Sequence, residues 1–532
     1  MRYCFTLYVC FLTIISYAQA PQVEWMKRYG GTSLNLLRSL IMTQDGGLML
    51  GGYSNSGISG IKTEARIGEN PDYWVIKTDI SGNVQWQKTI GGGDFIGELA
   101  GEVLNSVRQS TDGSYFLGGF SDSPVFGLKT SPNYGESDYW IVKINAVGTI
   151  LWQTSIGGSS YDFAYTMELT KDGGFIIGGE TWSGISGNKT EANKGGKDYW
   201  VVKLDSNGQI EWQKDYGGSG TDILYSILSF DDGYLLSGVS ASNISGDKTE
   251  NSKGGGDYWI IRTDLTGNIL WQKTIGGNSA DIPYKALKVS DGYVFGGVSN
   301  SSISFDKTEN NRGGYDYWLV KTDFDGNVLW DKTFGGDLDD NMDKFTGFQD
   351  ESGFVLVGTS YSGIYGDKTV VNYGEYNGWV VRTNENGEMM WQKGIGGSTS
   401  DGFNQVIELG DGSILLGGGA ISNVSGNLTV AGYGLDYWLV KLAPEELGTK
   451  GVFSDRLVVF PNPVVNEVNI NFAEPQAKVS LQLYNSLMQE IENVNYANVI
   501  QLTHPLKFPS GIYFIKITNQ DGEVFQTKIL KS

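Results

Sequence analysis

Two series of charged residues recur along the chain at regular spacing, and their side chains could do chemistry. Ten positions before each Asp-Gly-type turn stand Asn35, Glu102, Asp162, Asp222, Asp281, Asp340 and Asp401. Before each "DYW"-type stretch, and each followed by threonine, stand Lys62, Lys129, Lys189, Lys248, Lys307, Lys368 and Leu428. A ring of carboxylates could bind cations or sugar hydroxyls, and a ring of lysines could bind an anionic polysaccharide. The acids and lysines are therefore candidates for a ligand-binding face.

The gaps in the two series support a structural interpretation of the same residues. The first copy lacks the acid, at Asn35, and the last lacks the lysine, at Leu428. In a closed ring of repeats these two copies are neighbours. Their joint loss is expected if the lysine of each repeat pairs with the acid of the next, as Lys248 would with Asp281. Each exposed pair of this kind contributes about 0 to 1 kcal/mol. We favour this clasp over a ligand ring.

A third arrangement of oxygen ligands lies in the loop "SNISGDKTENSKGGGDYW". Asp247, Glu250 and Asp257 could bind calcium there. The run lacks the strict alternation of an EF-type loop, so loop capping by Asp and Thr is the simpler interpretation. Calcium is thus the one cation that we consider, and we expect no other cofactor.

Several catalytic groups are missing from the main body of the chain. The single histidine is His504, near the C-terminus, and the two cysteines are Cys4 and Cys10. Residues 21–443 therefore offer no Ser-His-Asp or Cys-His mechanism and no histidine metal site. We assign no catalytic residue.

Paired tryptophans reveal the elements that must position these side chains. The pairs are twelve residues apart, and successive pairs follow at about sixty residues: Trp74/Trp86, Trp140/Trp152, Trp200/Trp212, Trp259/Trp271, Trp318/Trp330 and Trp379/Trp391. Trp25 lacks a preceding partner and Trp438 lacks a following one. Together they complete a seventh pair, so the chain contains seven copies of one unit.

Each copy predicts two β-hairpins. "DYWVVKLD" alternates as a strand does, "SNG" supplies a turn, and "QIEWQKDYGG" returns. A second hairpin follows in "DILYSILSF", "DDG" and "YLLSGVS". Four short strands in each of seven units predict an all-β protein, a seven-bladed β-propeller. The N-terminal strand at residues 22–29 would pair with 436–442 and close the ring, burying sheet edges that would otherwise aggregate.

The pattern Asp79-x-x-Gly82-Asn83-x-x-Trp86, repeated at Asp205, Asp264 and Asp323, resembles the tryptophan-docking motif of quinoprotein-like propellers. It varies at Asn145 and Asn384. The resemblance covers residues 21–443 and implies that the tryptophans wedge between blades. The chain lacks the cofactor-contacting residues and adjacent cysteine pair of quinoprotein dehydrogenases, so we do not expect pyrroloquinoline quinone.

The N-terminus, MRYCFTLYVCFLTIISYAQA, has one positive charge, an apolar run and then Ala18-Gln19-Ala20. This pattern predicts a signal peptide over residues 1–20, cleaved after export. We expect no transmembrane segment in the mature chain.

The C-terminus contains a second targeting segment. Residues 444–456 read as a linker, and residues 457–532 resemble the type A C-terminal sorting domain of the type IX secretion system. The matching pieces are Phe460-Pro461-Asn462-Pro463, Leu483-Tyr484-Asn485, Ser510-Gly511-Ile512-Tyr513 and Lys528-Ile529-Leu530-Lys531. The short alternating strands predict a small Ig-like β-sandwich. The resemblance implies that the secretion machinery recognises this domain. The protein would then be released or attached to the outer cell surface.

The formal charge is 39 minus 60, or −21. Such a surface repels nucleic acid and anionic lipid, so we expect neither as a partner. The leading hypothesis is a non-enzymatic, exported or surface-attached propeller that binds a glycan or a protein. The alternatives are a secreted polysaccharide-degrading hydrolase that uses two carboxylates and a structural component of the surface.

Overall fold

The structure is a computed structural model that describes residues 20–93, 101–445, 457–460, 463–485, 489–520 and 524–531. The predicted signal peptide, apart from Ala20, lies outside the described residues. Most of the predicted linker lies outside them too, as do residues 94–100. The chain divides into two compact units, Gln22–Ala443 and a second that holds the C-terminal strands.

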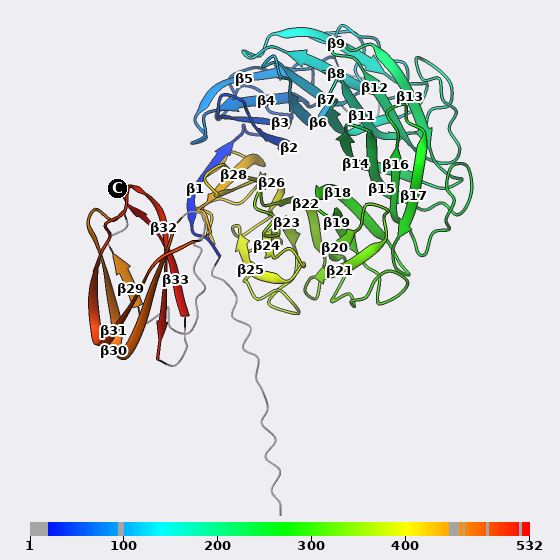
Figure 1. Ribbon diagram of the computed structural model, residues 1–532. Helices are drawn as coiled ribbons and strands as arrows, with labels where there is room; N and C mark the ends of the chain where they lie inside the picture. The colour runs from blue at the N-terminus through cyan, green and yellow to red at the C-terminus, as the bar shows by residue number, and fades with distance from the viewer. Residues whose placement is uncertain are drawn as a thin grey trace, which may run out of the picture. The chain divides into compact units, whose positions relative to one another are not determined.

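The larger unit consists of seven four-stranded antiparallel sheets, which follow one another along the chain in Figure 1. We number them sheet 1 (β2 to β5), sheet 2 (β6 to β9), sheet 3 (β10 to β13), sheet 4 (β14 to β17), sheet 5 (β18 to β21), sheet 6 (β22 to β25) and sheet 7 (β26 to β28 with β1). The prediction of an all-β protein built from repeated four-stranded units is confirmed. The described residues contain no helix, and thus none able to cross a membrane.

The first strands of the sheets are β2 (Asn35–Met42), β6 (Glu102–Gln109), β10 (Asp162–Leu169), β14 (Asp222–Phe230), β18 (Asp281–Val289), β22 (Asp340–Gly347) and β26 (Asp401–Glu408). Each contacts the first strands of the sheets on both sides, and β26 contacts β2. The first strands therefore surround a common axis.

The second strands are β3 (Leu48–Ser54), β7 (Tyr115–Ser121), β11 (Phe175–Thr181), β15 (Gly233–Ser240), β19 (Gly292–Ser299), β23 (Phe354–Ser360) and β27 (Ile414–Ala420). The third strands are β4 (Asp72–Thr78), β8 (Asp138–Ile144), β12 (Asp198–Leu204), β16 (Asp257–Thr263), β20 (Asp316–Thr322), β24 (Asn377–Thr383) and β28 (Asp436–Leu442). The loop that joins a second strand to a third is called the long loop below.

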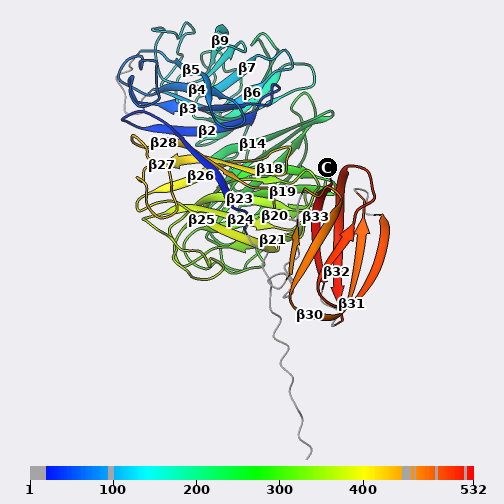
Figure 2. The same ribbon diagram turned by 90° about the vertical axis from the view of Figure 1, so that its left-hand side faces the viewer.

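The outer strands are β5 (Val84–Ile90), β9 (Ile150–Ile156), β13 (Ile210–Tyr216), β17 (Ile269–Ile275), β21 (Val328–Phe334), β25 (Met389–Ile395) and, in sheet 7, β1 (Val23–Tyr29). Strand β1 pairs antiparallel with β28, from Tyr29 opposite Tyr437 to Val23 opposite Leu442. Figures 1 and 2 show β1 beside β28, although the two strands are the first and last of this unit. The pairing expected for residues 22–29 is therefore present.

Packing between neighbouring sheets explains the tryptophan repeat. The tyrosine of each "DYW" packs on the first tryptophan of the next sheet; Tyr199 and Trp259, for example, have ring centroids 5.0 Å apart. The Tyr199 hydroxyl also donates to the Trp259 carbonyl. Contact of Tyr437 with Trp74 joins sheet 7 to sheet 1 in the same way. These buried rings supply the apolar cores between sheets.

The second tryptophan of each pair supports the next sheet's turn. Gly208 adopts a left-handed φ of 80°, and a Cβ there would lie 2.7 Å from Trp152 Cζ3. Glycine at this turn of the Asp-x-x-Gly pattern thus serves both the backbone conformation and the close approach to the indole. The same glycine-on-tryptophan contact recurs at Gly267 and Gly326.

The C-terminal unit is a five-stranded antiparallel sheet of β29 (Leu457–Phe460), β30 (Glu467–Tyr484), β31 (Glu490–Pro505), β32 (Gly511–Asn519) and β33 (Val524–Lys531). Strand β30 pairs with β29 through its first half and with β32 through its second, while β31 pairs along both. The core of the C-terminal unit includes the buried side chains of Val468, Leu481, Ile515 and Ile529.

Candidate binding site

The lysine series lies buried beneath the long loops. Lys248 Nζ lies 5.4 Å from the Trp259 ring centroid and donates to Thr274 Oγ1 at 2.6 Å. Thr274 belongs to the outer strand of the same sheet. The equivalent contacts join Lys62 to Thr89, Lys129 to Ser155 and Lys307 to Thr333. Each of these four lysines therefore connects its long loop to its own outer strand.

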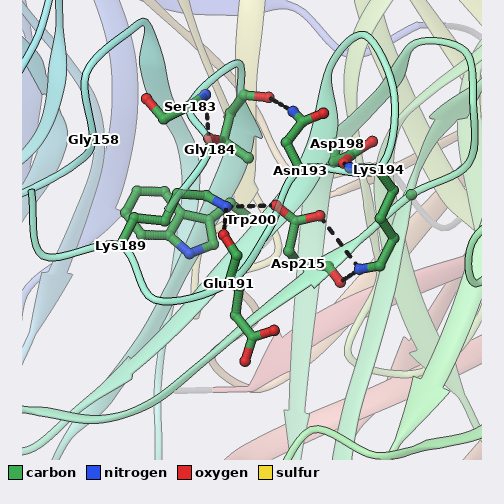
Figure 3. A network of polar contacts seen from close by, with 12 residues as sticks. Gly158, Ser183, Gly184, Lys189, Glu191, Asn193, Lys194, Asp198, Trp200 and Asp215 are labelled. Atoms are coloured by element: carbon green, nitrogen blue, oxygen red, sulfur yellow. Dashed lines mark hydrogen bonds and ion pairs between the residues drawn. The ribbon is translucent and has the colours of Figure 1, made fainter. Parts of the chain in front are cut away.

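Two members of the series vary this contact. In sheet 3 the outer strand carries Asp215, and Lys189 forms a buried ion pair with it at 2.7 Å (Figure 3). Figure 3 also shows Lys189 above the Trp200 indole, with the Glu191 carbonyl oxygen as a further acceptor. In sheet 6 the outer strand has Gly394 at this place, and Lys368 donates to the Ser362 carbonyl oxygen.

The acid series is also buried and holds the connections between sheets. Asp222 Oδ2 accepts the Gly218 backbone N–H at 2.8 Å and the Ser242 hydroxyl at 2.9 Å. Asp162, Asp281, Asp340 and Asp401 make the equivalent contacts, and Glu102 accepts the Ser121 hydroxyl. Since both series are at most 2% exposed, neither presents its charged group on the surface.

Burial shifts the pKa values of several members of both series toward the neutral forms. It raises the pKa of Glu102 to about 8 and those of Asp162 and Asp281 to about 6. It lowers the pKa values of Lys62, Lys129, Lys248 and Lys307 to about 8. Desolvation penalises the charged form of each group, as expected for groups that serve structure beneath a protein surface.

The expected clasp between sheets exists, but with other residues. Lys248 donates within its own sheet and not to Asp281. Instead, in sheets 3, 4 and 5 the cation four residues before the "DYW" aspartate reaches the next long loop: Lys194 Nζ lies 2.8 Å from Asp247 Oδ2, and Arg312 Nε lies 2.9 Å from Asp367 Oδ2. Lys253 pairs with Asp306 in the same way.

The gap at Leu428 has a different cause from the one expected. Arg28 of β1 occupies the outer-strand place that Thr89 has in sheet 1, opposite the first tryptophan. Its guanidinium lies 3.0 Å from Asp436 Oδ2 and donates to the carbonyl oxygens of Ser422 and Gly434. An outer-strand cation therefore replaces the long-loop lysine in sheet 7, and Leu428 fills the space that the lysine leaves.

The three calcium candidates have separate partners in the structure. Asp247 pairs with Lys194, and Glu250 Oε2 accepts the Thr274 backbone N–H at 2.5 Å. Asp257 Oδ2 accepts the Lys253 backbone N–H at 2.6 Å. These contacts cap the loop. Across the described residues, no group of three or more His, Cys, Asp or Glu side chains is arranged to hold a metal ion.

The long loops expose one aliphatic side chain per sheet at equivalent positions, just before the tight turn that precedes the lysine. These side chains are 56% to 69% exposed and form what we call the aliphatic ring: Ile58, Val125, Ile185, Ile244, Ile303, Ile364 and Val424. Scattered surface apolar residues are ordinary, but a β-branched side chain exposed at the same place in seven copies is not. The sequence contains this signal, and our sequence analysis missed it.

One long loop departs from the others at the tight turn. Six loops place a glycine there at a left-handed φ of 56° to 59°, whereas sheet 5 places Phe305 there at 49°. A bulky residue in this conformation costs about 1–2 kcal/mol. Phe305 is 70% exposed and borders an open groove of about 790 Å³ shared with Lys253, Lys273 and Asn327. Backbone strain of this kind is found more often at functional sites than at positions that serve packing alone.

Charged residues also break the repeat along the first strands, facing the axis. Arg108 of β6 makes a two-pronged ion pair with Glu168 of β10, with Nε to Oε2 at 3.0 Å. A cavity of about 390 Å³ opens beside Arg108 and is lined by Ile41, Gln109 and Leu169. Arg108 and Glu168 occupy the same position of their strands, where the other five sheets have Ile, Leu or Thr, so the sequence could have shown this break too.

The comparisons with known proteins identify the C-terminal unit. Residues 458–532 match the family model described as the secretion system C-terminal sorting domain. A curated relative, the regulatory protein FlaEY of Caulobacter vibrioides, is 24% identical over 189 residues. That match covers 33% of this chain, and the chain spans about a fifth of the relative's length.

Similar solved structures include the plexin A4 extracellular region, with a TM-score of 0.43, 9% identity and coverage of 94% of this chain and 62% of plexin. The phage phi92 endosialidase has a TM-score of 0.38 and 10% identity, covering 79% and 69%. Both are β-rich, and neither likeness identifies a function. The matched tail, by contrast, confirms the sorting domain and marks the protein as a secreted cargo of the type IX system.

Proposed function

We propose that the protein is a non-enzymatic binding or adhesion module for an extracellular glycan or protein. In this proposal residues 21–443 form a closed seven-bladed β-propeller of the tryptophan-docking type, released after cleavage at Ala20. Residues 444–456 are the linker and residues 457–532 a small Ig-like β-sandwich that directs export. The contacts of β26 with β2 and of β1 with β28 support ring closure.

The aliphatic ring carries the proposal. The charged residues that recur in every repeat are used inside the structure, where they tie loops to strands and sheets to one another. The aliphatic ring has no such role, because its seven side chains project into solvent. Exposed apolar side chains that gather on the loops of one molecule mark an interaction site. The sorting tail places this surface outside the cell.

A variant with Ile185, Ile244 and Ile303 all changed to Ser tests the proposal. The mature full-length protein is immobilised and probed with a glycan array and with the isolated surface polysaccharides and proteins of the producing cells. We expect a retained ligand whose binding falls at least tenfold in the triple variant. Released reducing ends are measured on every bound polysaccharide.

A matched control removes equally exposed apolar side chains elsewhere. Leu151, Leu270 and Leu329 lie on outer strands and are 52% to 58% exposed. Their change to Ser should leave binding unaltered. Equal loss in both triple variants would show nonspecific hydrophobic adsorption and would refute the proposed face.

One observation favours a hydrolase as the second candidate. Glu168 and Asp343 are acids at first-strand positions where the other sheets have none. Burial raises the pKa of Asp343 to about 6. Burial acts in the same direction on Glu168, but Arg108, Lys285 and Lys344 together outweigh it and lower the pKa of Glu168. One protonated and one ionised carboxyl group are what glycoside hydrolysis requires. Reducing ends released by the protein, and lost on Glu168→Gln, would favour this function over simple binding.

A further inference from the structure

The first strands of sheets 5 and 6 differ from those of sheets 1 to 4 in the type of their fifth residue. The fifth residue of the first strand is Ser39, Ser106, Thr166 or Ser226 in sheets 1 to 4, and Lys285, Lys344 or Gln405 in sheets 5 to 7. Ser226 Oγ accepts the Ala286 backbone N–H at 3.1 Å, and Ser39 Oγ accepts the Val107 N–H at 3.0 Å. The hydroxyl thus ties neighbouring first strands together. Two adjacent sheets, 5 and 6, have a lysine in place of this hydroxyl.

The two lysines make no direct ion pair. Among the contacts of the described residues, neither the Lys285 nor the Lys344 ammonium has a hydrogen bond or an ion pair. Both side chains are partly buried. Burial lowers the pKa of Lys285, and burial together with the Lys285 charge lowers the pKa of Lys344 to about 7. Two neighbouring ammonium groups held this way are unfavourable unless an anion joins them.

The opposite side of the axis carries the Arg108–Glu168 pair. The charges of Arg108 and Glu168 act on the pKa values of both lysines, which places the four side chains near one another. We call Arg108, Glu168, Lys285 and Lys344 the axial cluster. Three cations and one acid, with Asp343 also acting on Lys344, leave a net positive charge at the axis within a protein of net charge −21. A cavity opens beside Arg108 of the cluster.

An arc of tyrosines lies next to the axial cluster. Tyr165, Tyr225 and Tyr284 are the fourth residues of three consecutive first strands, with ring centroids 5.6 Å and 5.2 Å apart. Each lies at a β-bulge, which turns its side chain out of the regular ladder. Aromatic rings with a polar hydroxyl suit the apolar face and hydroxyls of a sugar. The arc ends at Tyr284, directly before Lys285.

We infer that the axis of the first strands binds an acidic sugar residue of a glycan, with its anionic group between Lys285 and Lys344 and its ring against the tyrosine arc. This inference rests on the proposed binding function and gives it a ligand class. Long-range repulsion from the acidic surface disfavours loose anion binding. Recognition therefore depends on these close contacts, and a single acidic sugar at a chain end or along a polymer satisfies them.

The test titrates the mature full-length protein with oligogalacturonate by isothermal titration calorimetry. The matched ligand is the same oligosaccharide after reduction of its carboxyl groups. We expect binding of the acidic form and at least tenfold weaker binding of the reduced form. Lys285→Ser with Lys344→Ser should weaken binding of the acidic form at least tenfold, because serine is the residue at this position in sheets 1, 2 and 4.

Two control proteins isolate the effect. Lys285→Arg with Lys344→Arg keeps both charges and should retain binding. Lys507→Ser removes an exposed lysine of the C-terminal unit and should bind like the parent. Thermal unfolding of each variant shows whether the fold is intact, and loss of binding counts only for folded protein.

The outcomes separate this inference from the proposed function. Unchanged binding in the folded double-serine variant, or equal binding of acidic and reduced ligands, overturns the axial site while the binding function stands. Binding of neutral glycans alone has the same meaning. No binding of any saccharide overturns the inference, and the proposed function is then decided by its own test with surface proteins.

Discussion

Single residues in this protein have roles set by what surrounds them and not by their type. The lysine before each threonine has the spacing of a ligand ring, yet it stacks on a buried tryptophan and donates to a hydroxyl of its own sheet. The carboxylates at the sheet junctions accept backbone N–H groups in a dry environment. A change in pH will therefore change the protonation of these carboxylates and not the binding of a ligand.

Asp138 gives a prediction about pH. Burial raises its pKa to about 7, whereas an unfolded aspartate titrates near pH 4. Between these values the folded chain binds the extra proton, so the contribution of this group to the free energy of unfolding falls as pH rises. Asp138→Asn copies Asn377 of sheet 6 and cannot ionise. We expect it to stabilise the protein by about 1 kcal/mol or more at pH 8 and to have little effect at pH 4.5.

Thermal or urea unfolding of the parent and Asp138→Asn at both pH values checks this. The Tyr134 backbone N–H, which Asp138 accepts, keeps an acceptor in the asparagine. Destabilisation of the same size at pH 4.5 and pH 8 would show that the carboxylate charge is not the source of strain.

Gly217 gives a prediction about close packing. A Cβ at this glycine would lie 2.0 Å from Asp198 Oδ1, so Gly217→Ala must displace the carboxyl group. We expect a loss of about 1–3 kcal/mol in the free energy of unfolding. Gly184 has no atom within 4 Å of an added Cβ, and Gly184→Ala should leave stability within about 1 kcal/mol. Equal effects of the two changes would contradict the packing argument.

At the scale of elements, β1 decides how the repeat ends. It completes sheet 7 by pairing with β28, and it carries Arg28 where the other outer strands carry a hydroxyl, an aspartate or, in sheet 6, a glycine. The buried Arg28–Asp436 pair therefore joins the two ends of the larger unit. Loss of one partner leaves an uncompensated charge, which costs more than the pair itself contributes.

Arg28→Thr tests the closing strand. We expect it to lower the free energy of unfolding by about 3–5 kcal/mol, because Asp436 loses its partner inside the structure. Adding Leu428→Lys gives sheet 7 the lysine and threonine arrangement of sheets 1, 4 and 5, and should recover much of the loss. Denaturant unfolding of both variants measures the difference. No recovery in the double variant would mean that the two arrangements are not equivalent.

At the scale of the whole molecule, export and recognition belong to different units. The matched sorting domain makes up one unit and has its own core, while the aliphatic ring and the axial cluster belong to the other. No disulfide is available to the mature chain that we expect, since Cys4 and Cys10 lie in the predicted signal peptide. Each unit must therefore be stable through its own packing.

Removal of residues 457–532 tests this division. In a cell with an active type IX system, we expect the truncated protein to accumulate in the periplasm, because it lacks the sorting domain. The full-length chain should appear outside the cell. Immunoblots of cell fractions, with circular dichroism of the purified truncated protein, measure location and folding together. Secretion of the truncated protein would contradict the role of the tail.

The sequence by itself determined the repeat, the four-strand unit, the pairing of residues 22–29 with 436–442 and the sorting tail. These features depend on local spacing: alternating strands, Asp-Gly turns and tryptophans twelve residues apart are visible in any one copy. A periodic chain repeats such signals seven times, which is why they could be read without a structure.

Only the tertiary structure decided what the charged residues do. Several acids stand before and after Lys248 in the chain, and nothing in the spacing shows that Thr274 is its acceptor or that Lys194 makes the bond to the next sheet. Arg28 and Leu428 are 400 residues apart, so the sequence does not show that Arg28 replaces the lysine that is missing at position 428. Burial and partner choice depend on contacts between distant segments, and those exist only once the sheets have packed.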